Sequence, residues 1–92
     1  YVLSPLEAFY KTTLGAAKAL HLSDQIGSLL PGMIADFIVI DYSVTQEQTM
    51  RSNYLQRIND WTLENRLFGL EILGDDRNIQ ATYLMGECVY NR

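Results

Sequence analysis

"IGSLLPGMIADFIVID", residues 26–41, is the stretch that decides how this chain folds. It ends in an unbroken apolar and mostly β-branched run, Phe37–Ile40, with an aspartate on either side. The run lacks the alternation of a half-exposed strand, so it predicts a strand that is covered on both faces. Pro31 and Gly32 suit the two central positions of a tight turn ahead of that strand.

The chain itself has little material with which to cover such a strand. Its 92 residues make one small domain at most. A chain of this size buries roughly 60–65% of its extended-chain surface on folding. We therefore expect cover from outside the segment, and because the sequence opens on Tyr1 rather than methionine we expect it to be part of something longer.

The residues before the strand predict a helix over 4–20. Ser4 can cap it, Pro5 occupies its first position, and Glu7 can close a capping box. Apolar residues at helical spacing form one face: Leu6, Phe9, Tyr10, Leu14, Ala17 and Leu20.

The residues after the strand are compatible with a short surface helix that begins near Thr45. Thr45 and Gln48 have the spacing of a capping box. Met50, Tyr54 and Ile58 would fall together on one face of this helix.

A stronger helix is predicted over 60–74. Asp60 or Thr62 is the expected cap, and Gly74 has the right place for a left-handed stop. The predicted buried stripe consists of four leucines: Leu63, Leu67, Leu70 and Leu73.

The end of the sequence predicts a β-hairpin, with strands around 79–85 and 88–90 and a turn at Gly86. The whole order is then helix, two strands, one or two helices and a terminal hairpin. This is an α+β pattern whose sheet cannot close on itself.

Composition excludes several classes of function. The net charge is −4 with no basic run, which argues against nucleic acid as a partner. No apolar run approaches the ~20 residues of a membrane span, and no signal-peptide pattern is present. Cys88 is the single cysteine and His21 the single histidine, so the segment lacks the ligands of a Cys/His zinc site and suits a reducing compartment.

"LGDDRN", residues 73–78, is the densest group of charged side chains. Asp75 and Asp76 next to Arg77 admit two interpretations. A metal or acid–base site would need the two carboxylates to converge, whereas neighbours in sequence usually diverge. A turn after a helix needs only an aspartate or asparagine bonded to nearby backbone, with Arg77 neutralising a carboxylate. We favour the turn, and if Arg77 has a role we expect it to tie this turn to neighbouring structure.

Other reactive side chains are better explained structurally. His21 suits the end of the first helix, where histidine tolerates left-handed backbone. Cys88 lies in a predicted strand and is expected to be a buried, inert thiol. No histidine base stands at a recognisable spacing from the candidate nucleophiles Ser4, Thr12, Thr13 and Ser28. Without positive charge nearby, the aromatic side chains favour core packing over base stacking: Tyr54, Trp61 and Phe68.

Two stretches resemble a known family. Residues 3–41 resemble the end of metal-dependent deaminases and related hydrolases of the amidohydrolase superfamily, where a helix with "A-T-x-x-A-A-x-A-L" leads into "G-S-L-x-P-G-K-x-A-D-x-V-V-x-D". Residues 67–91 resemble the C-terminus of the guanine deaminase family, with "L-G-D-D-R-N-I" ahead of a "Y-V-x-G-x-x-V-Y" hairpin. The two stretches cover about two thirds of the chain.

The resemblance implies a cytoplasmic zinc enzyme of purine catabolism that hydrolyses guanine to xanthine and ammonia. It implies that residues 1–22 form the last helix of a TIM barrel and residues 23–92 part of a composite β-sandwich with inserted helices. The barrel and N-terminal portions of the parent chain are the implied partners, and a homodimer of the parent is compatible with it. The family's catalytic and metal residues lie upstream, so none is carried over onto this segment and none of its residues is expected to bind zinc.

The chain departs from the family pattern at Met33, where a lysine is usual, and at His21, where a glycine is common. Two alternatives stay open. One is another amidohydrolase, such as a deaminase of cytosine or a hydrolase of chlorinated or aminated triazines. The other is a free-standing interaction module that binds a partner along its open sheet edge.

Overall fold

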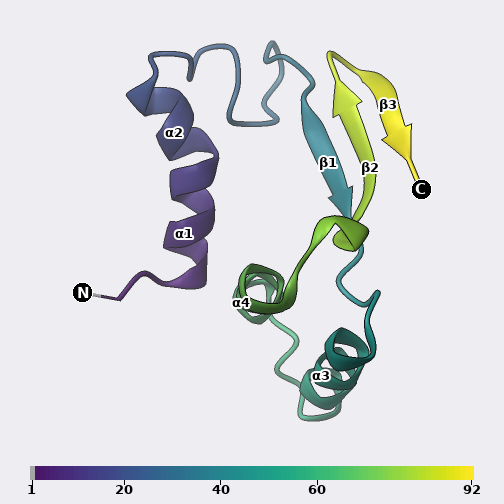
Figure 1. Cartoon of the computed structure of the whole chain (residues 1–92). Coiled ribbons are helices and arrows are strands. Elements are labelled where there is room, and N and C mark those ends of the chain that lie inside the picture. The colour runs from purple at the N-terminus through teal and green to yellow at the C-terminus, as the bar shows by residue number, and fades with distance from the viewer. Residues whose placement is uncertain (1) are drawn as a thin grey trace.

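The computed structural model describes residues 2–92, in which the N-terminal helical segment lies on one side, the small sheet on the other, and the two later helices below them (Figure 1). The elements in chain order are α1 (Pro5–Thr12), α2 (Leu14–Ala19), β1 (Phe37–Ile40), α3 (Gln46–Arg57), α4 (Leu63–Leu73), the 3₁₀ turn η1 (Asp76–Asn78), β2 (Ile79–Leu84) and β3 (Glu87–Asn91). Helix α4 contacts both α1 and α3. No helix within residues 2–92 has the length and apolar character needed to cross a bilayer.

The first predicted helix is present but is broken into α1 and α2 at Thr13. Its predicted start is confirmed, because the Glu7 backbone N–H donates to Ser4 Oγ at 3.1 Å and the Glu7 carboxylate accepts from the Ser4 N–H. The break follows from two neighbouring threonines. The hydroxyls of Thr12 and Thr13 both donate to the Phe9 carbonyl at 2.9 Å, competing with the helical bond that this carbonyl would otherwise accept.

Two helices end in the same left-handed stop. His21 has φ of 59°, the Leu22 N–H donates to the Ala17 carbonyl at 2.8 Å, and the His21 N–H donates to Lys18 at 3.1 Å. This pattern is a Schellman motif and confirms the interpretation of His21 as a helix-end residue. Asn59, also at φ of 59°, ends α3 in the same way.

Gly74 does not have the left-handed conformation that was predicted. Its backbone is extended, with φ of −74° and ψ of 152°. Glycine is needed there for a different reason, because a Cβ atom would overlap the Leu70 carbonyl oxygen. The cap of α4 is Thr62, whose hydroxyl accepts from the Asn65 N–H at 3.1 Å.

The sheet is antiparallel, in the order β1-β2-β3. Phe37 pairs with Tyr83 across β1 and β2, and their rings stack with centroids 4.6 Å apart. The predicted hairpin is confirmed: Met85 and Gly86 both have positive φ, as a two-residue primed turn requires. The predicted turn at Pro31 and Gly32 is confirmed too, since the Met33 N–H donates to Leu30 at 3.1 Å and Gly32 has φ of 89°.

One of the two strands predicted ahead of the helices is absent. Within residues 23–45 only β1 is a strand, and residues 26–34 form turns and irregular backbone. Backbone groups in that stretch form local hydrogen bonds, such as the one from the Ile34 N–H to the Gln25 carbonyl at 2.8 Å. They leave no ladder along which a second strand could pair.

Little of the apolar surface is buried within residues 2–92. The accessible surface is 6758 Å², against about 5,400 Å² for a folded monomer of this mass. The radius of gyration is 14.8 Å, against about 12 Å for a globular domain of this length. The buried apolar side chains among the described residues are Ala17, Leu55, Leu67 and Ala81.

The predicted apolar faces are consequently open. Of the α1–α2 face only Ala17 is buried, and of the four α4 leucines only Leu67 is. In β1, Ile38 and Val39 point to opposite faces and both are exposed, while Phe37 and Ile40 are half-buried, so residues 2–92 leave each face of the strand partly open. The expected cover would have to come from elsewhere.

Candidate functional site

The turn at residues 73–78 proves to be a closed backbone motif. Asp75 caps η1 by accepting the Arg77 N–H at 2.9 Å, and the Asn78 side chain accepts the Asp75 N–H at 3.0 Å. This is a reciprocal capping box around a single 3₁₀ turn. The structure therefore confirms the turn interpretation of this stretch.

Two of the charged side chains of the turn, Asp75 and Arg77, form an ion pair with each other. Arg77 Nη2 lies 2.6 Å from Asp75 Oδ2, on the molecular surface. The Arg77 side-chain and backbone N–H groups hold the pKa of Asp75 below its usual value, and Asp75 raises the pKa of Arg77. A carboxyl with a lowered pKa is a poor general acid near neutral pH. Asp76 is exposed, and its charge also contributes to the raised pKa of Arg77.

The residue that carries the turn is Asn78. It is the largest fully buried side chain among residues 2–92, with 1% of its surface exposed. Its Nδ2 donates to Gln48 Oε1 at 2.9 Å and to the Asp41 carbonyl at 2.7 Å. Its Oδ1 accepts from Gln48 Nε2 at 3.0 Å as well as from the Asp75 N–H.

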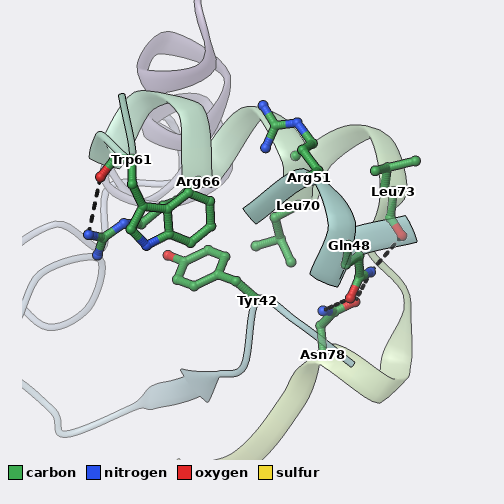
Figure 2. A pocket seen from close by; sticks show the side chains of 9 residues that line it. Tyr42, Gln48, Arg51, Trp61, Arg66, Leu70, Leu73 and Asn78 are labelled. Carbon is green, nitrogen blue, oxygen red and sulfur yellow. Dashed lines mark hydrogen bonds between the residues drawn. The ribbon is translucent and has the colours of Figure 1, made fainter. Parts of the chain in front are cut away.

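Gln48 completes this buried amide pair from α3, as Figure 2 shows. Its Nε2 also donates to the Leu73 carbonyl at 2.9 Å, and its Oε1 accepts from the Val44 and Thr45 N–H groups. Thr45 Oγ1 accepts the Gln48 N–H at 3.1 Å, which confirms the predicted capping box of α3. Every side-chain amide hydrogen of Gln48 and Asn78 donates to an acceptor, so this buried pair leaves no donor unsatisfied.

A second polar contact closes the turn from the C-terminal side. The Arg92 guanidinium pairs with Asp41 at 3.1 Å and also donates to the Arg77 carbonyl. The Ser43 N–H and then Arg92 lower the pKa of Asp41. The expected tie between the turn and its surroundings exists, but Asn78 and Arg92 make it, while the carboxylate bound by Arg77 belongs to the turn itself.

The hollows next to the turn do not make an enclosed small-molecule site. One cavity, lined in part by Tyr42, Trp61 and Arg66, has a volume of about 10 Å³, room for about one water molecule (Figure 2). Arg66 donates to the Trp61 carbonyl at 3.2 Å and lies over its ring, while its buried Nε has no partner among the described residues. Small-molecule pockets usually measure about 300–1,000 Å³.

The other hollow is an open groove of about 270 Å³ between β1 and α4, lined mostly by Ile38, Ile40, Leu70 and Ile79. The polar side chains beside it, Asp75 and Asn78, are engaged in the turn. The groove therefore offers apolar surface and no free catalytic group.

The remaining candidates lie apart from the turn. Cys88 is in β3 as predicted, but it is exposed rather than buried, because no element covers that edge strand within residues 2–92. Tyr54 and Phe68 are about half exposed, so their assignment to a core is wrong for this chain. Trp61 packs partly as predicted, edge-on to Tyr42 with ring centroids 6.0 Å apart. The hydroxyls of Ser4, Thr12 and Thr13 are hydrogen-bonded to backbone groups.

Sequence reasoning missed the importance of Gln48 and Asn78. The capping-box spacing placed Gln48 at the start of α3, and Asn78 followed from the turn motif. Neither signal indicates that the two side chains meet, because they are 30 positions apart in the sequence. Gln48 is a polar residue on the inward side of α3, and this position can be recognised only once the fold is known.

The fold and this turn define the class of protein. The sequence profile of the Amidohydrolase family matches residues 1–89, and the chain belongs to that family. It is 47% identical, over all 92 residues, to the guanine deaminase of Escherichia coli (strain K12). It is 31% identical over 80 residues, or 87% of its length, to the guanine deaminase of Dictyostelium discoideum.

Solved structures of guanine deaminases share the same fold. The E. coli enzyme superposes over the whole chain with a TM-score of 0.89 at 47% identity. The enzyme from Bradyrhizobium japonicum superposes over 98% of the chain with a TM-score of 0.85 at 29% identity. The chain spans 20% and 16% of the two curated relatives and 20% of each solved chain.

Proposed function

We propose that this chain is the C-terminal part of a guanine deaminase, an enzyme that hydrolyses guanine to xanthine and ammonia in purine catabolism. The observation that carries the proposal is the agreement with the E. coli enzyme, at 47% identity and a TM-score of 0.89 over the whole chain. The chain's own role in that enzyme is structural. It contributes the 73–78 turn, the α3–α4 hairpin and three strands.

The proposed division of labour follows from the chemistry of the side chains. Residues 2–92 contain no group of three His, Cys, Asp or Glu side chains close enough to hold a metal ion. They do not fit a zinc centre, and we derive no metal-dependent step from them. The proposal assigns zinc, the guanine pocket and the catalytic groups to other portions of the parent protein.

The open surface supports a partner within the same parent chain. Both faces of β1 are partly exposed and most of the α1–α2 face is exposed, which is unfavourable for apolar side chains in water. We propose that residues 1–22 act as the terminal helix of a barrel and residues 23–92 as part of a composite sandwich. The barrel and N-terminal portions of the parent would cover these surfaces, in a cytoplasmic enzyme.

The test is substrate comparison on the full-length protein that contains this chain. Xanthine and ammonia should form from guanine, and much less ammonia should form from cytosine or an aminated triazine. The isolated 92-residue chain should bind no stoichiometric zinc and deaminate nothing. No turnover of guanine by the zinc-loaded full-length protein would reject the activity, and one zinc per isolated chain would reject the placement of the metal site.

A further inference from the structure

One polar side-chain atom inside the molecule has no hydrogen-bond partner. It is Nε of Arg66 on α4, the one buried side-chain nitrogen or oxygen without a partner among residues 2–92. The rest of this guanidinium is well placed, because Nη2 donates to the Trp61 carbonyl at 3.2 Å and the group lies 5.1 Å from the centre of the Trp61 ring. A charged donor that stays unpaired away from solvent is costly, so Nε needs an acceptor.

The acceptor for Arg66 Nε cannot come from another part of the parent protein. Residues 2–92 close off this nitrogen by themselves, so no atom outside the segment can reach it while the segment keeps this structure. Arg66 differs in this respect from the exposed apolar faces of the chain, whose cover depends on other portions of the parent. Only a small molecule enclosed together with Arg66 can accept its hydrogen.

A cavity of suitable size lies at Arg66. Its volume is about 10 Å³, and Tyr42, Trp61 and Arg66 are among the residues that line it (Figure 2). This is about the smallest volume that holds a single water molecule, and it leaves no room for a larger ligand. A cation is excluded as well, because the positive charge of the guanidinium would repel it.

The cavity also offers a second polar contact. A buried water needs at least two polar partners. Gln48 Oε1 and Asn78 Oδ1 line the cavity but already accept hydrogen bonds from other groups. The Tyr42 hydroxyl has no such bond within the described part of the chain, and Figure 2 shows it turned toward the Trp61 and Arg66 side chains.

We propose that this cavity is a binding site for one internal water molecule, which accepts the Arg66 Nε–H and donates to the Tyr42 hydroxyl. The water joins α4 to the residue that closely follows β1, at a point where no direct hydrogen bond between Arg66 and Tyr42 is formed. It satisfies the remaining buried donor beside the Gln48–Asn78 pair. The site is independent of which substrate the parent enzyme accepts.

Crystal structures of the full-length protein test the site, at a resolution that orders internal water and with bromide as the only halide. The unaltered protein should show one water within hydrogen-bonding distance of Arg66 Nε and no anomalous bromide signal there. Arg66→Met removes the donor and leaves an apolar lining, so the water should be lost. Arg57→Met is the matched control, because Arg57 is exposed on α3 and its loss should leave the water in place.

Tyr42→Phe tests the second contact in solution. Loss of the hydroxyl should speed hydrogen exchange in peptides that span residues 61–67 by about fivefold, the equivalent of one ordinary hydrogen bond. Tyr54→Phe makes the same change at an exposed position of α3 and should leave this exchange unchanged. Finding no water, a protein atom or bromide at Arg66 Nε would overturn the proposal. So would a water that persists in Arg66→Met, or unchanged exchange in Tyr42→Phe.

Discussion

Replacing Asn78 with alanine should loosen the 73–78 turn by about 3 kcal/mol. The substitution removes four hydrogen bonds, two to Gln48, one to the Asp41 carbonyl and one from the Asp75 N–H. Asp41 and Asp75 lie near the surface, where water can replace the lost bonds at a modest cost. Gln48 is 5% exposed, and one hydrogen of its Nε2 would be left without an acceptor.

That buried hydrogen makes up the largest part of the expected loss. An unsatisfied buried donor costs about 1–3 kcal/mol, and each ordinary hydrogen bond contributes about 1 kcal/mol net. Gln48 keeps its bonds to Leu73, Val44 and Thr45, which limits the damage. The double variant Gln48→Ala/Asn78→Ala removes both partners, so its cost should fall short of the sum of the two single costs by about 1 kcal/mol or more.

Native-state hydrogen exchange on the full-length protein is the appropriate assay, because it reports local opening rather than unfolding of the entire chain. Amides in peptides that span residues 73–84 should exchange about a hundredfold faster in Asn78→Ala. Asn53→Ala is the matched control, since Asn53 is exposed on α3 and its loss should change little. Unchanged exchange in Asn78→Ala, or additive single costs, would refute the claim that the amide pair holds the turn.

Three further changes test neighbouring contacts. Gly74→Ala should destabilise the end of α4 by about 1–3 kcal/mol, because its Cβ would overlap the Leu70 carbonyl, and a lower melting temperature measures this. The pKa of Asp75 is lowered in the folded state, so its contribution is present above the unfolded value of 3.8 and is lost as pH falls through the folded value. In Asp75→Asn the free energy of unfolding should therefore vary less with pH in the acid range. Its dependence on pH in the alkaline range should be unchanged. Arg77→Ala should leave the rate of guanine deamination unchanged and lower stability only slightly, because its partner is exposed within the same turn; lost turnover with an unchanged melting temperature would contradict this.

Local signals in the sequence were read correctly because their physics is local. Ser4 with Glu7, and Thr45 with Gln48, satisfy helix-end N–H groups within a few residues, so spacing alone identifies them. Gly74 shows the limit of this reasoning. A glycine after a helix usually indicates left-handed backbone, but here it provides room for the Leu70 carbonyl, a contact that no spacing rule encodes.

Burial was harder to predict, because periodicity shows which side chains share a face but not what lies against it. Leu67 is buried while Leu63, on the same predicted stripe, is 58% exposed. Helix α3 is the clearest example: Met50, Tyr54 and Ile58 do share a face, yet the opposite face, with Gln48 and Ser52, is the one packed inward. Only long-range contacts decide that outcome, and the sequence gives no direct sign of them.

The 73–78 turn shows how a segment with little core of its own can still specify one arrangement. Apolar burial is non-directional, so the few buried apolar side chains among residues 2–92 would tolerate several packings of α3 and α4 against the sheet. The Gln48–Asn78 pair tolerates one, because four amide hydrogens must meet their acceptors simultaneously. Any rotation of α3 leaves buried donors unpaired, which is more costly than the apolar contacts it could gain. The amide pair therefore fixes which face of α3 is turned outward and which face is packed against α4 and the 73–78 turn.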